Sequence, residues 1–264
     1  MTNTTKKNIT EKNYPELAEE LQKIKRMGVL LSGGCDSEVL QRAAVDVLGP
    51  KNTIAFHAST PFITDYYKNI VKNTASKLKT KLVYVKLNPL QIKDITTNTE
   101  KRCYYCKKAI YSSVIETALT HNITKLADGT NLDDTKEHRP GRKAAAELKI
   151  LQPFLKTKMT KAKIRHLGKL LNMEDSNRPS DSCLATRVNT NTPITEDIIT
   201  IISKIEEPLR PHVKGRLRAK ASKKQINLHY QKIDSDLINT HKNTLKAIAD
   251  YYKKKIIFTE IADS

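Results

Sequence analysis

The sequence predicts an α/β fold, in which a parallel sheet carries helices on both faces, followed by a small α+β module. Over the first 171 residues, short apolar runs alternate with segments of helical periodicity, a pattern typical of parallel sheets. A polar stretch at 172–194 interrupts this alternation, and we expect it to be a linker. From 195 to 264 the order becomes helix, strand, strand, helix, strand, which predicts a separate α+β domain.

The first strand and helix of the N-terminal domain flank a glycine-rich turn. Met27–Leu31 is a short apolar run that ends at Ser32-Gly33-Gly34, and apolar residues then recur at helical spacing from Val39 to Leu48. The turn therefore lies at the carboxyl end of a strand, where such sheets bind their ligands. The same alternation predicts further strands at 53–58, 81–87 and 125–128 and helices at 67–78, 106–119 and 160–171.

The C-terminal domain begins with an amphipathic helix. Thr195 is a typical helix cap, and a stripe of isoleucines follows it before Pro208. Val213–Lys220 then alternates strictly between small or apolar and basic residues, which predicts a strand with Arg216 and Arg218 on its polar face. The remaining predicted elements are a strand at 225–230, a helix at 237–252 and a strand at 255–261.

Composition excludes several classes of protein. With 264 residues, 38% of them hydrophobic, the chain can bury a sizeable core. No run approaches the roughly 20 apolar residues of a membrane-spanning helix. The N-terminal residues are polar and lack the apolar segment of a signal peptide, so we expect a cytoplasmic protein. In that compartment the four cysteines are expected to be reduced thiols or metal ligands.

The net charge of +19 leaves two interpretations open. It comes from 47 Lys and Arg against 28 Asp and Glu, and such a field attracts phosphate polyanions, including RNA and nucleotides. However, the lysines are scattered over every segment, which is typical of a solvated surface. Charge alone therefore does not separate a tRNA substrate from a small nucleotide.

The turn Ser32-Gly33-Gly34-Cys35-Asp36-Ser37 predicts a phosphate site. Glycines allow backbone N–H groups to approach an anion, and the N-terminus of the following helix attracts negative charge. The segment lacks the lysine of the GxxxxGK[ST] loop, which disfavours enzymes that transfer the γ-phosphate. The alternative is a tight turn in which Asp36 or Ser37 caps the helix. We interpret Cys35 as a variable loop position and not a ligand.

Three cysteines form the second candidate site. Cys103 and Cys106 are spaced as CxxC, and Cys183 lies far downstream. A CxxC pair is compatible with a metal or with a redox dithiol. Three thiolates can hold a 4Fe-4S cluster with one iron open, whereas structural zinc needs a fourth ligand, for which His138 or His212 is available. The remaining alternative is that the thiols only pack in the core.

The hexapeptide resembles the SGGxDS signature of the PP-loop ATP pyrophosphatases, a superfamily with an adenine nucleotide alpha hydrolase-like fold. The resemblance implies that the loop holds the pyrophosphate end of ATP while a substrate oxygen attacks the α-phosphate with the help of Mg²⁺. Asp36 is expected to take part in this catalysis. The ATP site is expected to comprise Ser32, Gly33, Gly34, Asp36, Ser37, Ser59, Asp128, Gly129, Thr130 and Asn131.

Further segments resemble the LarE family, ATP-dependent sulfur transferases of nickel-pincer nucleotide synthesis. The similar segments are Asp128–Asp134 followed by Arg139-Pro140-Gly141, Asp181–Arg187, Cys103–Tyr111, and Arg216-Leu217-Arg218. The family's Trp-Tyr-Tyr-Ala-Lys-Lys segment has Cys103 here in place of its tryptophan, and this sequence contains no tryptophan. The acidic pair Asp133 and Asp134 could instead cap a loop.

The resemblance implies a substrate and two possible sulfur sources. The substrate is pyridinium-3,5-biscarboxylic acid mononucleotide, which becomes a thiocarboxylic acid. In the single-cysteine type, the residue matching Cys183 gives up its own sulfur once and ends as dehydroalanine. In the three-cysteine type, Cys103, Cys106 and Cys183 hold a 4Fe-4S cluster whose open iron delivers added sulfide. The cysteines of this chain fit the second type.

A mononucleotide substrate needs a phosphate anchor. Arg187, Arg216 and Arg218 are the candidates because guanidinium grips phosphate through paired hydrogen bonds. They could instead be solvated cations. The expected partners are the nucleotide, sulfide or a sulfur-donor protein, and further copies of the chain in a homo-oligomer. The alternatives to this function are a PP-loop tRNA thiolase with the same chemistry and a non-enzymatic ATP-binding or cluster-storage protein.

Overall fold

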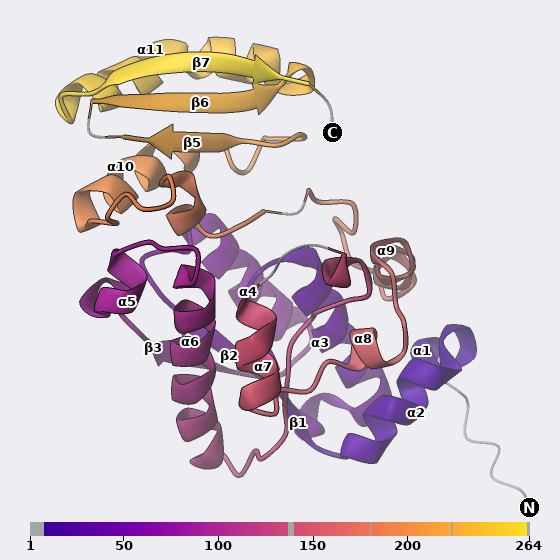
Figure 1. The fold of residues 1–264 in the computed structure, drawn as a ribbon. Coiled ribbons are helices and arrows are strands. Elements are labelled where there is room, and N and C mark those ends of the chain that lie inside the picture. Colours follow the sequence, from indigo (N-terminus) through magenta and orange to yellow (C-terminus); the bar gives the residue numbers. More distant parts are fainter. Residues whose placement is uncertain (1–7, 137–139, 180, 223, 263–264) are drawn as a thin grey trace, which may run out of the picture. The chain divides into compact units, whose positions relative to one another are not determined.

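The computed structural model describes residues 8–136, 140–179, 181–222 and 224–262 (Figure 1). These residues separate into two compact units. Unit 1 contains the residues up to Ser59 together with Lys68–Leu87 and Cys106–Asn177. Unit 2 contains Thr60–Tyr67, Asn88–Tyr105 and the residues from Arg178 onward. No helix in these described ranges is both long and apolar enough to cross a membrane.

Unit 1 is built on a four-stranded sheet in which every pair of neighbouring strands is parallel. The strand order is β3-β2-β1-β4, so the chain leaves β1 toward β2 on one side and later returns to pair β4 on the other. Ligands of such sheets bind at the carboxyl ends of the strands where this direction switches. The strands are β1 (Met27–Leu30), β2 (Thr53–Ser59), β3 (Lys81–Lys86) and β4 (Leu126–Ala127).

Helices cover both faces of this sheet, as the sequence predicts (Figure 1). On one face, Val29 of β1 packs in a buried cluster with Val39 and Ile164. On the other face, the ring of His121, just beyond helix α6, lies 6.0 Å from that of Phe56. The longer helices are α2 (Pro15–Ile24), α3 (Cys35–Leu48), α4 (Asp65–Lys77), α6 (Arg102–Leu119), α7 (Gly141–Glu147) and α9 (Lys161–Leu170).

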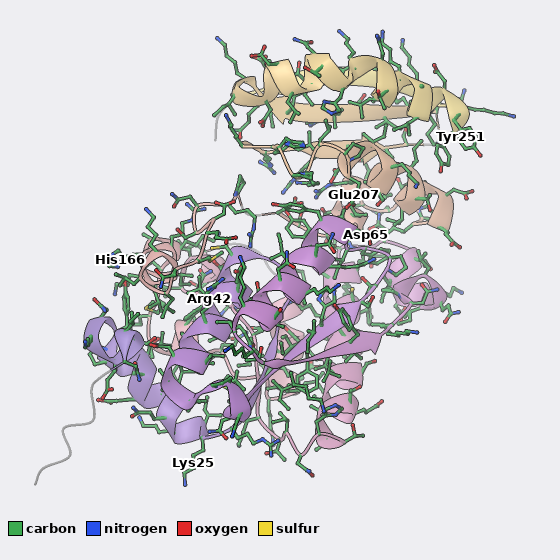
Figure 2. All side chains as sticks on the ribbon, turned by 180° about the vertical axis from the view of Figure 1, so that it is seen from behind. Lys25, Arg42, Asp65, His166, Glu207 and Tyr251 are labelled. Atoms are coloured by element: carbon green, nitrogen blue, oxygen red, sulfur yellow. The ribbon has the colours of Figure 1, made fainter. Side chains whose placement is uncertain are left out.

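A buried charge pair fixes helix α3, which carries the candidate phosphate loop at its start. Arg42 and Glu38 pair one helical turn apart at 3.0 Å, and both side chains are almost fully buried. Arg42 Nη1 also donates to the Leu171 carbonyl at 3.3 Å, which joins α3 to the end of α9 (Figure 2). The remaining short helices of unit 1 include α1 (Ile9–Asn13), α8 (Pro153–Lys156) and the 3-10 turns η1 (Pro50–Asn52) and η3 (Asp133–Thr135).

Unit 2 contains a three-stranded sheet of order β5-β6-β7. β5 is antiparallel to β6, and β6 is parallel to β7, to which it is joined through helix α11. The predicted C-terminal α+β module is therefore present. Its elements are α10 (Glu196–Glu206), β5 (Arg218–Ala221), β6 (Gln225–Gln231), η5 (Lys232–Asp234), α11 (Ser235–Tyr251) and β7 (Lys255–Ile261), preceded by η2 (Pro89–Gln91), α5 (Lys93–Thr96) and η4 (Leu184–Arg187).

The predicted strand Val213–Lys220 is wrong in its first half, since β5 begins only at Arg218. The backbone N–H groups of residues 214–216 donate to the side chains of Asp234 and Gln231, and not to a neighbouring strand. A Cβ on Gly215 would lie 2.5 Å from Gln231 Oε1, so the Gln231 side chain would have to shift to admit it. The expected alternation survives in β5, where Ala219 and Ala221 are buried and Lys220 is exposed.

Two further boundaries differ from expectation. Helix α6 begins at Arg102, so Cys103 and Cys106 both lie on it, whereas the sequence predicted a start at Cys106. Residues 172–194, expected as a linker, are divided between the units after Asn177 and contain η4. Unit 2 also includes Thr60–Tyr67 and Asn88–Tyr105, which the sequence analysis assigned to the N-terminal domain.

Candidate active site

The phosphate loop connects β1 to α3 and is held by its own serines. Gly33 has φ of 88°, a conformation that favours glycine. The Ser37 hydroxyl accepts from Ser32 N at 3.2 Å and donates to the Gly34 carbonyl at 2.9 Å. In the described structure no side chain caps α3, which begins at Cys35. The helix dipole favours an anion at this end of α3.

A second loop, Asp128–Asn131, follows β4 and meets the phosphate loop. Because β1 and β4 are neighbours and parallel, both loops leave the same edge of the sheet. Asn131 Nδ2 donates to Asp36 Oδ2 at 2.9 Å. A Cβ on Gly129 would lie 2.8 Å from Ser37 N, so only glycine permits this approach. The structure thereby brings the predicted ATP residues of the two loops together, and Ser59 ends β2 at the same edge.

The acidic residues of this edge have unequal environments. Burial, and then the neighbouring charge of Asp134, raise the pKa of Asp36, while Lys161 and Asn131 oppose this rise. Asp134 Oδ2 accepts from Asn131 N at 3.1 Å, and Asp133 Oδ2 accepts from Lys161 N at 2.8 Å. Asp133 and Asp134 therefore accept hydrogen bonds from backbone N–H groups, as residues that cap a loop do. This is the alternative that the sequence left open for them.

Helix α6 contributes a chain of polar groups that the sequence analysis missed. The Tyr111 hydroxyl donates to Asp128 Oδ2 at 2.5 Å and accepts from Lys107 Nζ at 2.8 Å. Both Tyr111 and Asp128 are buried. Burial alone would raise the pKa of Asp128, but Lys107 and the hydrogen bonds from Tyr111 and Thr130 hold it below its ordinary value. The i, i+4 spacing of Lys107 and Tyr111 was the available signal in the sequence.

Two of the three candidate cysteines lie close together within unit 2. Arg102 Nη2 donates to Cys103 Sγ at 3.4 Å, and its Nη1 donates to the Ala185 carbonyl, two residues after Cys183, at 3.0 Å. Cys183 keeps contact with solvent. Desolvation by nearby protein atoms raises the pKa of its thiol, Cys103 adds to the rise, and Arg102 and Arg187 oppose it.

The third cysteine lies one turn further along the same helix. Cys106 follows Cys103 by three residues on α6, so the two thiols point to the same side of the helix. Within the described ranges, no group of three or more His, Cys, Asp or Glu side chains is arranged to hold a metal ion. His212 is exposed, and His138 lies outside the described residues. Cys35 Sγ donates to the Ser176 carbonyl at 3.4 Å.

Arg187 is the largest fully buried side chain of the structure and closes the loop that carries Cys183. Its Nη1 donates to the Ser182 carbonyl at 3.1 Å, and its Nη2 donates to Asp181 Oδ1 at 2.7 Å. Its Nε donates to Glu206 Oε1 at 2.8 Å. These contacts occupy the guanidinium inside the protein. Its expected role as a phosphate ligand stays a prediction. In the structure, its guanidinium holds the loop that carries Cys183 through these hydrogen bonds.

Glu206 joins several segments of unit 2. Its carboxylate pairs with Arg187 and with Arg210, and it accepts a hydrogen bond from Ala219 N in β5 at 2.7 Å. Burial alone would raise the pKa of Glu206, but the two arginines hold it below its ordinary value. Glu207, the next residue, caps a different segment, since its Oε1 accepts from Tyr66 N at 2.7 Å (Figure 2).

Arg218, another candidate phosphate ligand, has one buried donor that no described residue pairs. Arg218 begins β5 and is partly buried, and its Nε is buried with no hydrogen-bond partner in the described part of the chain. Burial, and then the charges of Arg216 and Arg187, lower the pKa of Arg218. The carboxylates of Asp181 and Glu206 oppose this lowering.

Comparison with known proteins gives relatives that span most of the chain. No family model matches it. The uncharacterized protein MJ0830 of Methanocaldococcus jannaschii is 32% identical over 238 residues, which cover 90% of each chain. The uncharacterized protein slr1717 of Synechocystis is 28% identical over 200 residues, 76% of this chain and 74% of the relative.

A third relative has a described activity. The pyridinium-3,5-bisthiocarboxylic acid mononucleotide synthase of Lactiplantibacillus plantarum is 28% identical over 194 residues, 74% of this chain and 70% of the synthase. That similarity agrees with the resemblance found in the sequence. The chain belongs to the same family as MJ0830 of Methanocaldococcus jannaschii, and its similarity to the synthase fits the LarE family.

Proposed function

We propose that this protein is an ATP-dependent sulfur transferase that converts a carboxylate of pyridinium-3,5-biscarboxylic acid mononucleotide into a thiocarboxylate. The observation that carries the proposal is the meeting of the phosphate loop with the Asp128–Asn131 loop at the carboxyl edge of the sheet. Similarity to the synthase of Lactiplantibacillus plantarum supports the choice of substrate.

The phosphate loop would bind the pyrophosphate end of ATP. Its Ser32 and Ser37 hydroxyls hold the turn, and backbone N–H groups at the start of α3 would donate to phosphate oxygens. Mg²⁺, when bound beside Asp36, would neutralise part of the charge of ATP. The repulsion that Asp134 exerts on the partly buried Asp36 carboxylate is consistent with a cation there.

The reaction has two steps. In the first, a carboxylate oxygen of the substrate attacks the α-phosphorus of ATP, the bond to the β-phosphate oxygen breaks, and pyrophosphate leaves. In the second, a sulfur nucleophile at the sulfide level attacks the acyl carbon, AMP leaves with the original carboxylate oxygen, and the product is a thiocarboxylate. Adenylation is needed because an unactivated carboxylate oxygen leaves poorly.

The three cysteines supply the residue types of a three-thiolate site, although the described structure does not arrange them as a metal-binding group. Cys103 lies close enough to Cys183 to affect its pKa, and Cys106 is one helical turn from Cys103. A 4Fe-4S cluster bound to these three thiolates would supply an open iron that accepts sulfide. The solvent contact of Cys183 is equally compatible with donation of its own sulfur, so an experiment has to separate the two.

The first experiment measures pyrophosphate release from ATP and Mg²⁺ with the biscarboxylic mononucleotide. We expect release only when both nucleotides are present, and Asp36→Asn should lower the rate by about 100-fold. Asp46→Asn, on the same helix but remote from the loop, is the matched control and should retain the rate. Release that needs tRNA instead would favour a tRNA thiolase, and release without any second substrate would contradict a transferase.

The second experiment tests the thiolate site. Protein purified without oxygen and reconstituted with iron and sulfide should hold about four irons. Cys103→Ala should lose them, whereas Cys35→Ala should not, because the thiol of Cys35 already donates to a backbone carbonyl elsewhere. If the wild-type protein holds no iron, the cluster is excluded and Cys183 becomes the sulfur source to test.

A further inference from the structure

The sheet of unit 2 has two unlike faces. Helix α11 covers one of them, since Lys242 Nζ lies 5.5 Å from the ring of Phe258 and the register partner of Phe258, Leu228, is buried. Neighbouring residues of a strand point to opposite faces. The residues that alternate with Phe258 and Leu228 therefore lie on the face away from α11.

That second face is cationic along β5 and β6. Arg218 of β5 stands directly opposite His229 of β6 in the antiparallel register, and directly opposite side chains share a face. Lys220 lies two residues further along β5 and so points the same way. Arg216 also acts there, because burial, then Lys220, and then Arg216 lower the pKa of His229. We call Arg216, Arg218, Lys220 and His229 the cationic face.

Among the described residues of β7, those nearest His229 on this face are uncharged. The residue opposite His229 on β7 is Thr259, and the residues that flank Thr259 on the same face are Ile257 and Ile261. Arg218 Nε is buried and lacks a hydrogen-bond partner among the described residues. An unpaired buried donor and a cluster of like charges are both costly, and a bound anion would relieve both.

We propose that His229 is a ligand of the substrate's phosphate and that the cationic face selects a terminal phosphomonoester over an internal phosphodiester. This inference rests on the proposed function and adds a ligand to the phosphate site. A terminal phosphate carries a charge of about −1.5 to −2 at pH 7 and three acceptor oxygens. A diester carries one charge and two free oxygens. A third donor at His229 matches the third terminal oxygen and the extra negative charge, which only the monoester has.

The test uses the full-length protein with nicotinamide mononucleotide as the phosphomonoester probe. Nicotinamide riboside, which lacks the phosphate, and dimethyl phosphate, a diester, are the comparison ligands. His229→Ala should weaken mononucleotide binding by about tenfold, the loss of one charge-assisted hydrogen bond. It should leave riboside binding unchanged. His241→Ala, on the helix that covers the opposite face, is the matched control and should bind the mononucleotide as the wild-type protein does.

A second readout keeps the proposal falsifiable if the variant is damaged. In the wild-type protein, the imidazole resonances of His229 are followed by NMR as inorganic phosphate is added. Phosphate in contact with the ring should raise the pKa of His229 by about one unit. The proposal is overturned if phosphate leaves this pKa unchanged, if His229→Ala binds the mononucleotide normally, or if the diester binds as tightly as the monoester. Normal phosphate binding without sulfur transfer would instead contradict the proposed function alone.

Discussion

The two units build their candidate sites in different ways. In unit 1 the phosphate loop is one contiguous stretch, Ser32–Ser37, and its donors are backbone N–H groups. In unit 2 the loop around Cys183 is held by charged side chains from separate segments, with Glu206 of α10 at their centre. A contiguous loop can be read from the sequence, whereas a network assembled from distant residues cannot.

The difference also predicts how each site fails. A loop of backbone donors tolerates many side-chain changes but not added volume, because its atoms already approach one another closely. A buried charge network tolerates no loss of one partner, because the remaining charge is left unpaired away from water. Stability measurements on variants of each unit, with local unfolding followed by hydrogen exchange, can test this difference.

The largest effect is expected for Glu206→Ala. The carboxylate is fully buried, and its removal leaves Arg187 and Arg210 without their shared partner. We expect the free energy of unfolding, measured in urea, to fall by about 3–5 kcal/mol. Faster hydrogen exchange should be confined to peptides of unit 2. Glu196→Ala, an exposed position on the same helix, should cost less than about 1 kcal/mol. Equal losses for the two variants would contradict the central role of Glu206.

Tyr111→Phe should have the next largest effect. It removes the hydrogen bond that the buried Tyr111 hydroxyl donates to Asp128, and it leaves Lys107 without that acceptor. A hydrogen bond to a charged group contributes about 2 kcal/mol, which is the expected loss of unfolding free energy. Tyr84→Phe, a half-exposed position of the same unit, serves as the control. An unchanged Tyr111→Phe variant would show that the polar chain does not stabilise unit 1.

Gly129→Ala tests the packing of the two loops of unit 1. The added Cβ would lie 2.8 Å from Ser37 N, and backbone atoms must move to admit it. We expect a loss of at least about 1 kcal/mol of unfolding free energy, together with weaker ATP binding measured by calorimetry. For Gly34→Ala the nearest atom is Ser32 Oγ at 3.4 Å, an ordinary contact, so its stability should change less. The reverse order would mean that the loops do not meet as described.

The smallest effect concerns pH. The pKa of Asp128 in the folded protein lies below the ordinary value of 3.8, so the folded state binds this proton less readily than the unfolded chain. Its contribution to stability is therefore present above that ordinary pKa and is lost as the pH falls through the folded value. Asp128→Asn should flatten this part of the acid dependence in urea titrations below about pH 5. If the slope of unfolding free energy against pH is the same in Asp128→Asn as in the wild-type protein, other groups cause the acid sensitivity.

Much of the fold follows from local patterns. The strand before Ser32-Gly33-Gly34, the helix after it and the α+β module were all predicted from periodicity. The error at Val213–Lys220 arose because alternation also suits an extended segment whose N–H groups bond to the side chains of Asp234 and Gln231. Periodicity indicates on which face of an element a side chain lies. It does not show which group accepts the hydrogen bond of the backbone N–H.

The site was predicted less completely. The sequence predicted the residues of the phosphate loop, but it could not place Tyr111 beside Asp128, since that contact depends on how α6 packs on the sheet. It treated Arg187 as a phosphate ligand because nothing local distinguishes a buried arginine from an exposed one. Only the carboxylates of Asp181 and Glu206, brought near by the fold, explain its burial.

ATP-dependent sulfur transfer is tested by counting the thiocarboxylate product formed per protein molecule. Wild-type protein, reconstituted without oxygen, is given ATP, Mg²⁺, the biscarboxylic mononucleotide and excess sulfide, and the product is measured by mass spectrometry. We predict product in several-fold excess over protein, with the mass of Cys183 unchanged. Product limited to one per protein with dehydroalanine at Cys183 would overturn the three-thiolate proposal, and the absence of any thiocarboxylate would contradict sulfur transfer itself.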